Sequence, residues 1–201
     1  MGLAGLGDGL GEALAVLVAA LRVPVMLAAV AVLLACGYEL GRFAAEAWRR
    51  RVRSRGTDLA GLVRQAAADP QAAALCAYRA PSGFAAAALE AIATARACGR
   101  AQEIEPALAA YEVAVQRRLD RTRVLVRAGP AIGLMGTLIP LAPGLEALGE
   151  GNVAQLADDL RDAFAATVVG LLVGTVAFAL TLRRTRLYSE DLEALERGAG
   201  R

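Results

Sequence analysis

Three polar residues lie where they could help to move an ion across a membrane. Thr137 lies near the middle of an uncharged stretch, 128–145, and Thr167 lies inside a second one, 163–182. A threonine hydroxyl in an apolar helix either bonds back to a carbonyl of its own helix or faces water or a proton-carrying partner. Asp162 directly precedes the second stretch, where its carboxylate suits either a gate or a headgroup boundary favoured by the helix N-terminus. It precedes Thr167 by five residues, about 140° around a helix, so the two are only loosely aligned.

The two uncharged stretches have the length and composition of a membrane hairpin. Each is close to the roughly 20 apolar residues that cross a bilayer core, and residues 146–162 between them are polar and acidic. Small residues recur every three or four positions, a spacing that lets helix backbones approach closely in lipid. The glycines alone indicate packed helices, but with the threonines they suit a pore wall better than a lipid anchor. The small residues are Gly129, Gly133 and Gly136 in the first stretch, and Ala166, Gly170 and Gly174 in the second.

Two prolines interrupt the expected hairpin. Pro140 and Pro143 lie in the last third of the first stretch, where each removes a backbone hydrogen bond and should bend or unwind the helix. Carbonyls freed in this way are tolerated in a membrane only where they face protein or water. The prolines therefore also favour an interior shared between helices.

Composition places the chain among helical membrane proteins. Of its 201 residues, 57% are hydrophobic and only 4% aromatic, and the mean hydropathy is +0.46. Alanine and leucine favour helix over strand. We therefore predict an all-α membrane protein with three transmembrane helices that extend into a cytoplasmic helical lobe. There is no histidine and the three cysteines lie far apart, so the sequence indicates neither a zinc site nor a Cys/His nucleophile, and no cofactor or metal is expected.

The charges are unevenly distributed and predict an orientation. Arginines cluster at 42–55, after the first apolar run, and at 183–186, after the last, whereas 146–162 is acidic. Short arginine-rich flanks stay in the cytoplasm. We expect a multi-pass protein of the cell (inner) membrane, with the N-terminus outside and the lobe and C-terminus in the cytoplasm. The adjacent membrane span explains the arginines without a nucleic-acid partner.

The first span is expected to begin at Pro24. A crossing that included Arg22 would bury its charge, which is expensive. We therefore place residues 11–21 along the outer interface and Pro24 in the first helical turn, where proline is well tolerated. Glu39 and Arg42 then lie at the inner boundary.

The region after the first span predicts short helices and then a long one. Helical spacing and turn residues predict helices at 57–68, 71–79 and 84–98. From Ile104 no breaker occurs before Gly129, so one helix is expected to run from the lobe into the membrane. The predicted organisation is an outer segment with a short interfacial helix (1–22), the first transmembrane helix (23–41), the cytoplasmic lobe (42–127), the transmembrane hairpin (128–182) and a cytoplasmic tail (183–201).

The hairpin resembles the MotA/TolQ/ExbB family of channel-forming subunits in proton-driven membrane motors. The resemblance rests on residues 129–138, Gly-Pro-Ala-Ile-Gly-Leu-Met-Gly-Thr-Leu, and residues 162–171, Asp-Ala-Phe-Ala-Ala-Thr-Val-Val-Gly-Leu. The paired motifs are far more specific than either one, and the three-span layout also agrees. The chain departs from the family pattern at Pro140 and Pro143, where the family usually continues as an uninterrupted apolar helix.

The resemblance implies a multi-subunit motor complex rather than an isolated pore. Family members form pentamers around the transmembrane helices of a single-span partner that resembles MotB, TolR or ExbD and carries the proton-binding aspartate. By position, Thr137 and Thr167 would take the roles of the pore-facing threonines, and Asp162 that of the acid at the start of the third helix. The compact chain is more similar to TolQ and ExbB than to a flagellar subunit.

Two other classes of function are weighed against this one. A non-conducting membrane scaffold or assembly subunit would use the same helix packing without an ion path. An intramembrane enzyme is poorly supported, because no Ser/His, Cys/His or paired carboxylates converge inside the spans.

Overall fold

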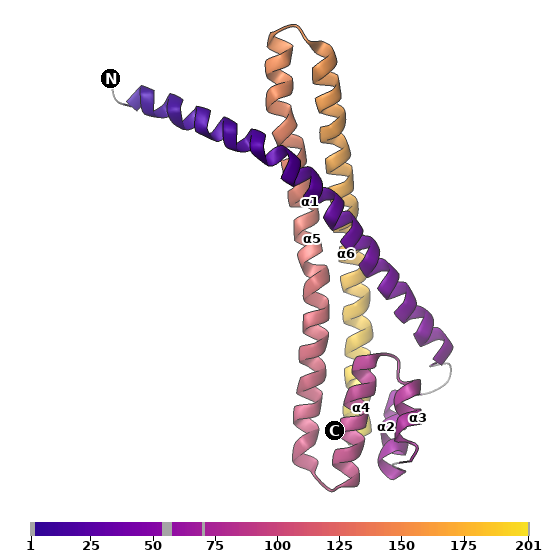
Figure 1. Ribbon diagram of the computed structural model, residues 1–201. Helices are drawn as coiled ribbons and strands as arrows, with labels where there is room; N and C mark the ends of the chain where they lie inside the picture. The colour runs from indigo at the N-terminus through magenta and orange to yellow at the C-terminus, as the bar shows by residue number, and fades with distance from the viewer. Residues whose placement is uncertain (1–2, 54–57, 70, 201) are drawn as a thin grey trace. The chain divides into compact units, whose positions relative to one another are not determined.

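A computed structural model describes residues 3–53, 58–69 and 71–200, and within these ranges it contains helices and no strand (Figure 1). This confirms the predicted all-α class. Three of the helices are long and apolar enough to cross a membrane, as the sequence predicted. The elements are α1 (Leu3–Arg53), α2 (Leu59–Ala68), α3 (Ala73–Arg79), α4 (Gly83–Ala97), a short 3-10 turn η1 (Ala101–Glu103), α5 (Ile104–Gly149) and α6 (Val153–Ala199).

The prolines do not interrupt the long helices. Pro24 lies inside α1, so the expected helix start at this residue is wrong. Pro130, Pro140 and Pro143 all lie inside α5, so of the two effects expected at Pro140 and Pro143, bending or unwinding, the unwinding is wrong. Each proline removes one backbone hydrogen bond, but an apolar segment that leaves the helix in lipid would expose several unpaired polar groups. Continuing the helix is the less costly choice.

The polar segment between the two apolar stretches is mostly helical. α5 extends to Gly149 and α6 begins at Val153, so the connection is only Glu150–Asn152. Gly151 turns the chain with φ of +83°, a conformation that costs glycine little. The Asn152 side chain then accepts a hydrogen bond from the backbone N–H of Gln155 at 3.2 Å, which is a usual way to begin a helix.

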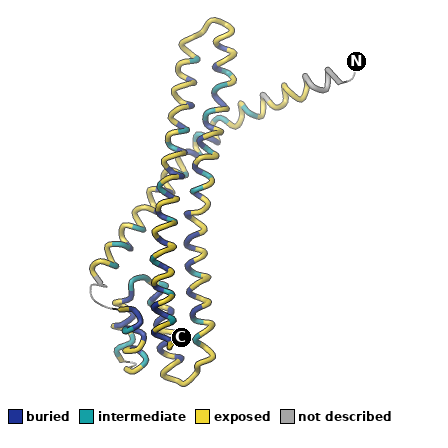
Figure 2. The backbone as a smooth tube through the Cα atoms, turned by 180° about the vertical axis from the view of Figure 1, so that it is seen from behind, coloured by how far each residue is buried: buried dark blue, intermediate teal, exposed yellow. Residues whose placement is uncertain are grey.

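The described chain divides into two compact units, and each long helix contributes to both. Unit 1 comprises residues 1–37 and 124–178, and unit 2 comprises residues 38–123 and 179–201. In unit 1 the segments of α5 and α6 lie side by side (Figures 1 and 2), with a small core of Cys36, Leu125, Val173 and Ala177.

Unit 2 contains the larger core. The short helices α2, α3 and α4 lie within three residues of their predicted positions, and Figure 2 shows many buried residues along them. Side chains capping α2 and α4 accept hydrogen bonds from backbone N–H groups, Asp58 from Ala60 and Ser82 from Ala85. The core packs these short helices against α5 and α6, through residues such as Leu89, Ile92, Tyr111, Tyr188 and Leu195.

Candidate functional site

The five predicted glycines of the hairpin are all buried, and three of them, Gly129, Gly133 and Gly170, lie where α5 and α6 touch backbone to backbone. A Cβ atom built on Gly170 would lie 2.5 Å from the carbonyl oxygen of Gly129 and 2.7 Å from Cα of Gly133. One built on Gly129 would lie 2.7 Å from the carbonyl oxygen of Gly170 and 2.9 Å from the backbone nitrogen of Gly174. These distances leave no room for a side chain, because the atoms in the way belong to backbone.

On both sides of this backbone contact, toward the turn and away from it, side chains take the place of backbone. A Cβ on Gly136 would lie 2.5 Å from Cβ of Ala166, and one on Gly174 would lie 2.9 Å from the ring of Pro130. We call Gly129, Gly133, Gly136, Gly170 and Gly174 the glycine seam. The seam holds the two helices close together, and Thr167 lies beside it, with its Cα 3.4 Å from a Cβ built on Gly133.

The two threonines use their hydroxyls differently. Thr137 donates to the carbonyl of Leu134 in its own helix at 2.7 Å, the local bond that makes a lone threonine uninformative. Thr167 is half-buried, and its hydroxyl lies 3.5 Å from the carbonyl of Gly133 across the seam and 3.4 Å from that of Ala163 in its own helix. No direct hydrogen bond joins the two hydroxyls among the described residues. Thr167 is therefore the threonine at the helix contact.

Asp162 lies at the opening of a groove between α1 and α6 in unit 1. The groove has a volume of about 400 Å³, and Asp162 is the only charged residue among those lining it. The side chain of Asp162 is 56% exposed, and Arg22 comes no closer than 4.0 Å to it. Its carboxylate is accessible to water, as either a gate or a boundary residue requires. The remaining lining residues are Met26, Ala29, Val30, Leu33, Ala165, Ala166 and Val169.

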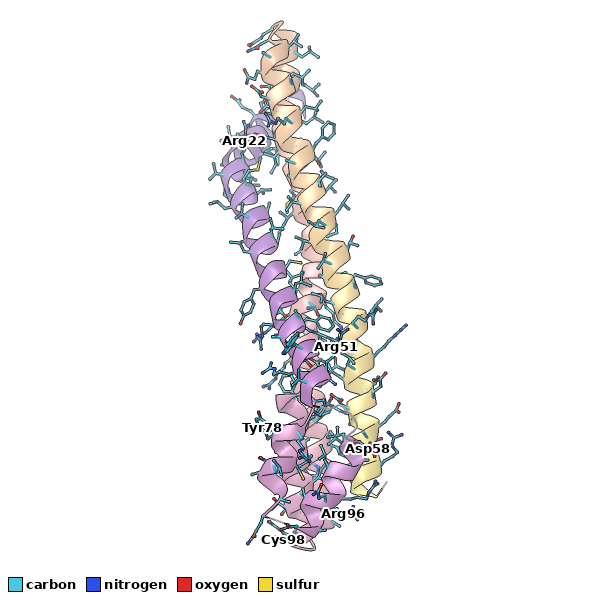
Figure 3. The ribbon with its side chains drawn as sticks, turned by 90° about the vertical axis from the view of Figure 1, so that its right-hand side faces the viewer. Arg22, Arg51, Asp58, Tyr78, Arg96 and Cys98 are labelled. Carbon is cyan, nitrogen blue, oxygen red and sulfur yellow. The ribbon has the colours of Figure 1, made fainter. Side chains whose placement is uncertain are left out.

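A buried ion pair that the sequence did not predict lies one turn before Asp162. Arg22 of α1, labelled in Figure 3, donates to Oδ1 of Asp159 at 2.7 Å. The Asp159 side chain is only 7% exposed, and its Oδ2 has no hydrogen-bond partner within the described ranges. This contact gives Arg22 a counter-ion. The counter-ion lowers the cost of burying its charge, which was the reason for placing Arg22 outside the first span. The acidic residues before Asp162 were the only sequence signal for this ion pair, and they did not identify Arg22 as the partner.

Comparison with known families decides how this hairpin is interpreted. The family model described as the MotA/TolQ/ExbB proton channel family matches residues 79–197, more than half of the chain and all of the glycine seam. The chain belongs to this family. No curated protein and no solved structure matches it. Membership confirms the resemblance stated above and supports a role in a proton channel or motor, within a membrane complex with partner proteins.

This MotA/TolQ/ExbB family member also contains a buried charge cluster in unit 2. Glu39 of α1 accepts from Arg184 of α6 at 2.8 Å and from Arg118 of α5 at 3.2 Å. Arg184 is fully buried, and it also donates to the backbone carbonyl of Glu39 at 3.2 Å. Its guanidinium carbon lies 5.8 Å from the ring centroid of Phe43. One carboxylate therefore ties together three helices that are far apart in the sequence.

A second charged layer lies further along the same helices. Arg50 donates to both carboxylate oxygens of Asp191, at 3.0 and 2.7 Å, and to Glu46 at 3.2 Å. Tyr188 donates to the other oxygen of Glu46 at 3.1 Å, and its own backbone carbonyl accepts from the Tyr111 hydroxyl. Burial and the nearby Glu46 raise the pKa of Tyr188 to about 12. Burial also raises the pKa of Asp191, although Arg50 opposes the shift.

Sequence reasoning placed Glu39 at the inner membrane boundary but did not assign it partners. The signals available were an acid directly after an apolar run and arginines in the other two long helices. To pair Glu39 with these arginines, one must know which turns of the three helices lie side by side. The sequence alone does not contain that information.

Proposed function

We propose that this protein is the channel-forming subunit of a motor driven by the proton-motive force. In this proposal five copies surround the helices of a single-span partner like ExbD, TolR or MotB, with the N-terminus outside and the C-terminus in the cytoplasm of a cell (inner) membrane. Ion flow along the partner is converted into mechanical work for transport or envelope processes. The observation that carries the proposal is the glycine seam with Thr167 across it, within the segment matched by the family.

The proposal requires a partner because the hairpin offers no proton carrier in its apolar stretches. Residues 128–145 and 163–182 contain no Asp or Glu, and a relay across a membrane needs ionisable groups. Asp162 lies at the beginning of the second stretch, and the buried Asp159 is already paired with Arg22. In the proposed complex the partner contributes the mid-membrane carboxylate, and Thr167 and Thr137 line its path.

The assembly is tested by native mass spectrometry of the detergent-purified protein, expressed with and without a neighbouring single-span subunit. We expect a five-subunit ring that gains partner chains on co-expression. A monomer or dimer under both conditions would contradict the motor assembly and favour a non-conducting scaffold.

Ion conduction is tested by replacing the polar atoms while keeping the side-chain shape. In proteoliposomes that contain both subunits, Thr167→Val and Asp162→Asn are each expected to lower proton flux roughly five- to tenfold, the scale of one lost hydrogen bond. Thr137→Val should have a smaller effect, because its hydroxyl is already bonded to its own helix. Thr175→Val is the matched control, since Thr175 is an exposed threonine of the same helix.

The scaffold alternative makes the opposite prediction. It requires full function after Thr137→Ala and Thr167→Ala, whereas bulky replacements in the glycine seam would still abolish it. If Thr167→Val and Asp162→Asn both keep full flux at normal expression, the assignment of the ion path is wrong.

A further inference from the structure

Two cavities of unit 2 share three lining residues and are rich in arginine. The larger, of about 350 Å³, is lined by four arginines and two apolar residues and by no acid. The smaller, of about 310 Å³, is lined by three arginines and by one acid, Glu46. Both volumes are in the range of small-molecule sites. The lining residues used below are Arg42, Phe84 and Arg118, which are common to both cavities, with Arg117 and Arg121 in the larger and Arg49 in the smaller.

Three of the four arginines of the larger cavity have no counter-ion within 4.0 Å among the described residues, and the fourth, Arg118, is paired with Glu39. Arg117 and Arg121 are both exposed and lie one turn apart on α5, a spacing at which like charges repel. Within the described ranges no carboxylate lies within 4.0 Å of Arg117, Arg121 or Arg42. An anion between these side chains would relieve the repulsion.

Two carboxylates adjoin the cavities, Glu46 in the lining of the smaller one and Glu39 against Arg118, and both are already used. Glu46 accepts from Arg50 with one oxygen and from Tyr188 with the other. Glu39 is shared between Arg118 and Arg184, so this group of three carries one excess positive charge. Burial and the nearby Arg184 lower the pKa of Arg118, with Arg42 adding to the shift and Glu39 opposing it. Among the residues that line the larger cavity, no acid balances the four arginines.

The predicted spans would place the cavity near the depth of lipid headgroups. Arg42 directly follows the first predicted span, 23–41, and Arg121 precedes the predicted second span by seven residues, about 10 Å of helix. Arginine side chains reach toward the interface along their aliphatic stems. Trp48, which is 71% exposed, lies further along α1, and exposed tryptophans are typical of the interface between membrane and water.

We propose that the larger cavity binds the phosphate of an anionic membrane lipid, held by Arg42, Arg117 and Arg121. Planar guanidinium groups match phosphate oxygens in pairs, and basic pockets at the cytoplasmic ends of membrane helices suit such headgroups. The site goes beyond the proposed ion path and does not depend on it, because it uses none of the hairpin residues. An orthophosphate ion offers the same chemistry, so the test separates the two sources.

The test is a titration of the purified full-length protein in detergent with fluorescent phosphatidylglycerol. We expect saturable binding, and at least tenfold weaker binding to Arg117→Gln/Arg121→Gln, because each arginine contributes substantially to anionic-lipid affinity. Zwitterionic phosphatidylcholine should bind at least tenfold less tightly. The control variant is Arg183→Gln/Arg186→Gln, which removes the same charge from exposed positions near the end of the third predicted span, and its binding should stay within about twofold of the unmodified protein.

Each remaining outcome has a defined meaning. Equal weakening in the two double variants would show attraction by overall charge and would overturn the site. Displacement of the lipid by inorganic phosphate at equal concentration would identify a free anion as the ligand and overturn the lipid proposal. Arg117→Lys/Arg121→Lys, which keeps both charges but not the planar guanidinium groups, should bind more tightly than the glutamine variant and less tightly than the unmodified protein. Gel filtration of every variant verifies that the fold is intact.

Discussion

Gly170→Leu is expected to separate the two hairpin helices and to abolish both proton flux and stable assembly. Even the first added carbon would lie 2.5 Å from the Gly129 carbonyl oxygen and 2.7 Å from Gly133 Cα. Those atoms are backbone, so a change of rotamer cannot make room, and the helices must move apart along the seam. Overpacking a well-packed interior typically costs 1–3 kcal/mol, and we expect at least about 3 kcal/mol here because backbone must move.

A smaller substitution at the same position tests this prediction more sharply, because the close contact and the helix propensity change the stability in opposite directions. Replacing a glycine by alanine in a helix stabilises it by about 1 kcal/mol through intrinsic propensity alone. Gly37→Ala is the control, since nothing lies within 4 Å of a Cβ at that position, and it should be neutral or stabilising. Gly170→Ala should be destabilising despite the same gain in propensity. Thermal unfolding in detergent measures both, and equal effects would show that the close contact does not restrain the hairpin.

Glu39→Gln is expected to be the most damaging change among the buried charges. It removes the one carboxylate that pairs with Arg118 and Arg184 within the described ranges, while leaving both guanidinium groups in place. Breaking a buried ion pair by deleting one partner costs about 3–5 kcal/mol, because the remaining charge is left without compensation. We therefore expect the thermal midpoint in detergent to fall by about 10 °C.

The double variant shows whether the loss comes from uncompensated charge. In Glu39→Gln/Arg184→Gln one of the two buried positive charges is also removed, so the double variant should be more stable than Glu39→Gln alone. The exposed Glu90→Gln is the control for losing a negative charge, and its effect should be under about 0.5 kcal/mol. A Glu39 variant as stable as the Glu90 variant would show that the cluster contributes nothing to folding.

Local patterns in the sequence predicted the features that depend on neighbouring residues. The absence of a breaker after Ile104 correctly predicted one helix from the lobe to the hairpin, and the turn residues around α2, α3 and α4 gave their positions. The paired motifs gave the family correctly. Each of these features depends on residues close together in the chain, so periodicity and turn chemistry were sufficient to find them.

The features that the sequence did not predict depend on pairing between distant turns. Arg22 meets Asp159 across 137 positions, and Glu39 meets Arg184 across 145. Local spacing contains no information about such a register. The helix start at Pro24 and the unwinding at Pro140 and Pro143 were wrong for a different reason. Those expectations considered only the local loss of hydrogen bonds and not the greater cost of unpaired backbone in an apolar setting.

The brevity of the Glu150–Asn152 connection has a consequence for how force could leave the molecule. In the proposed orientation these three residues, with the adjoining helix ends, are all that the chain exposes to the outside between its second and third spans. A connection of this length is too short to reach and bind a distant envelope component. In the proposed motor the external lever would therefore belong to the partner, and this subunit would form the ring against which that lever turns.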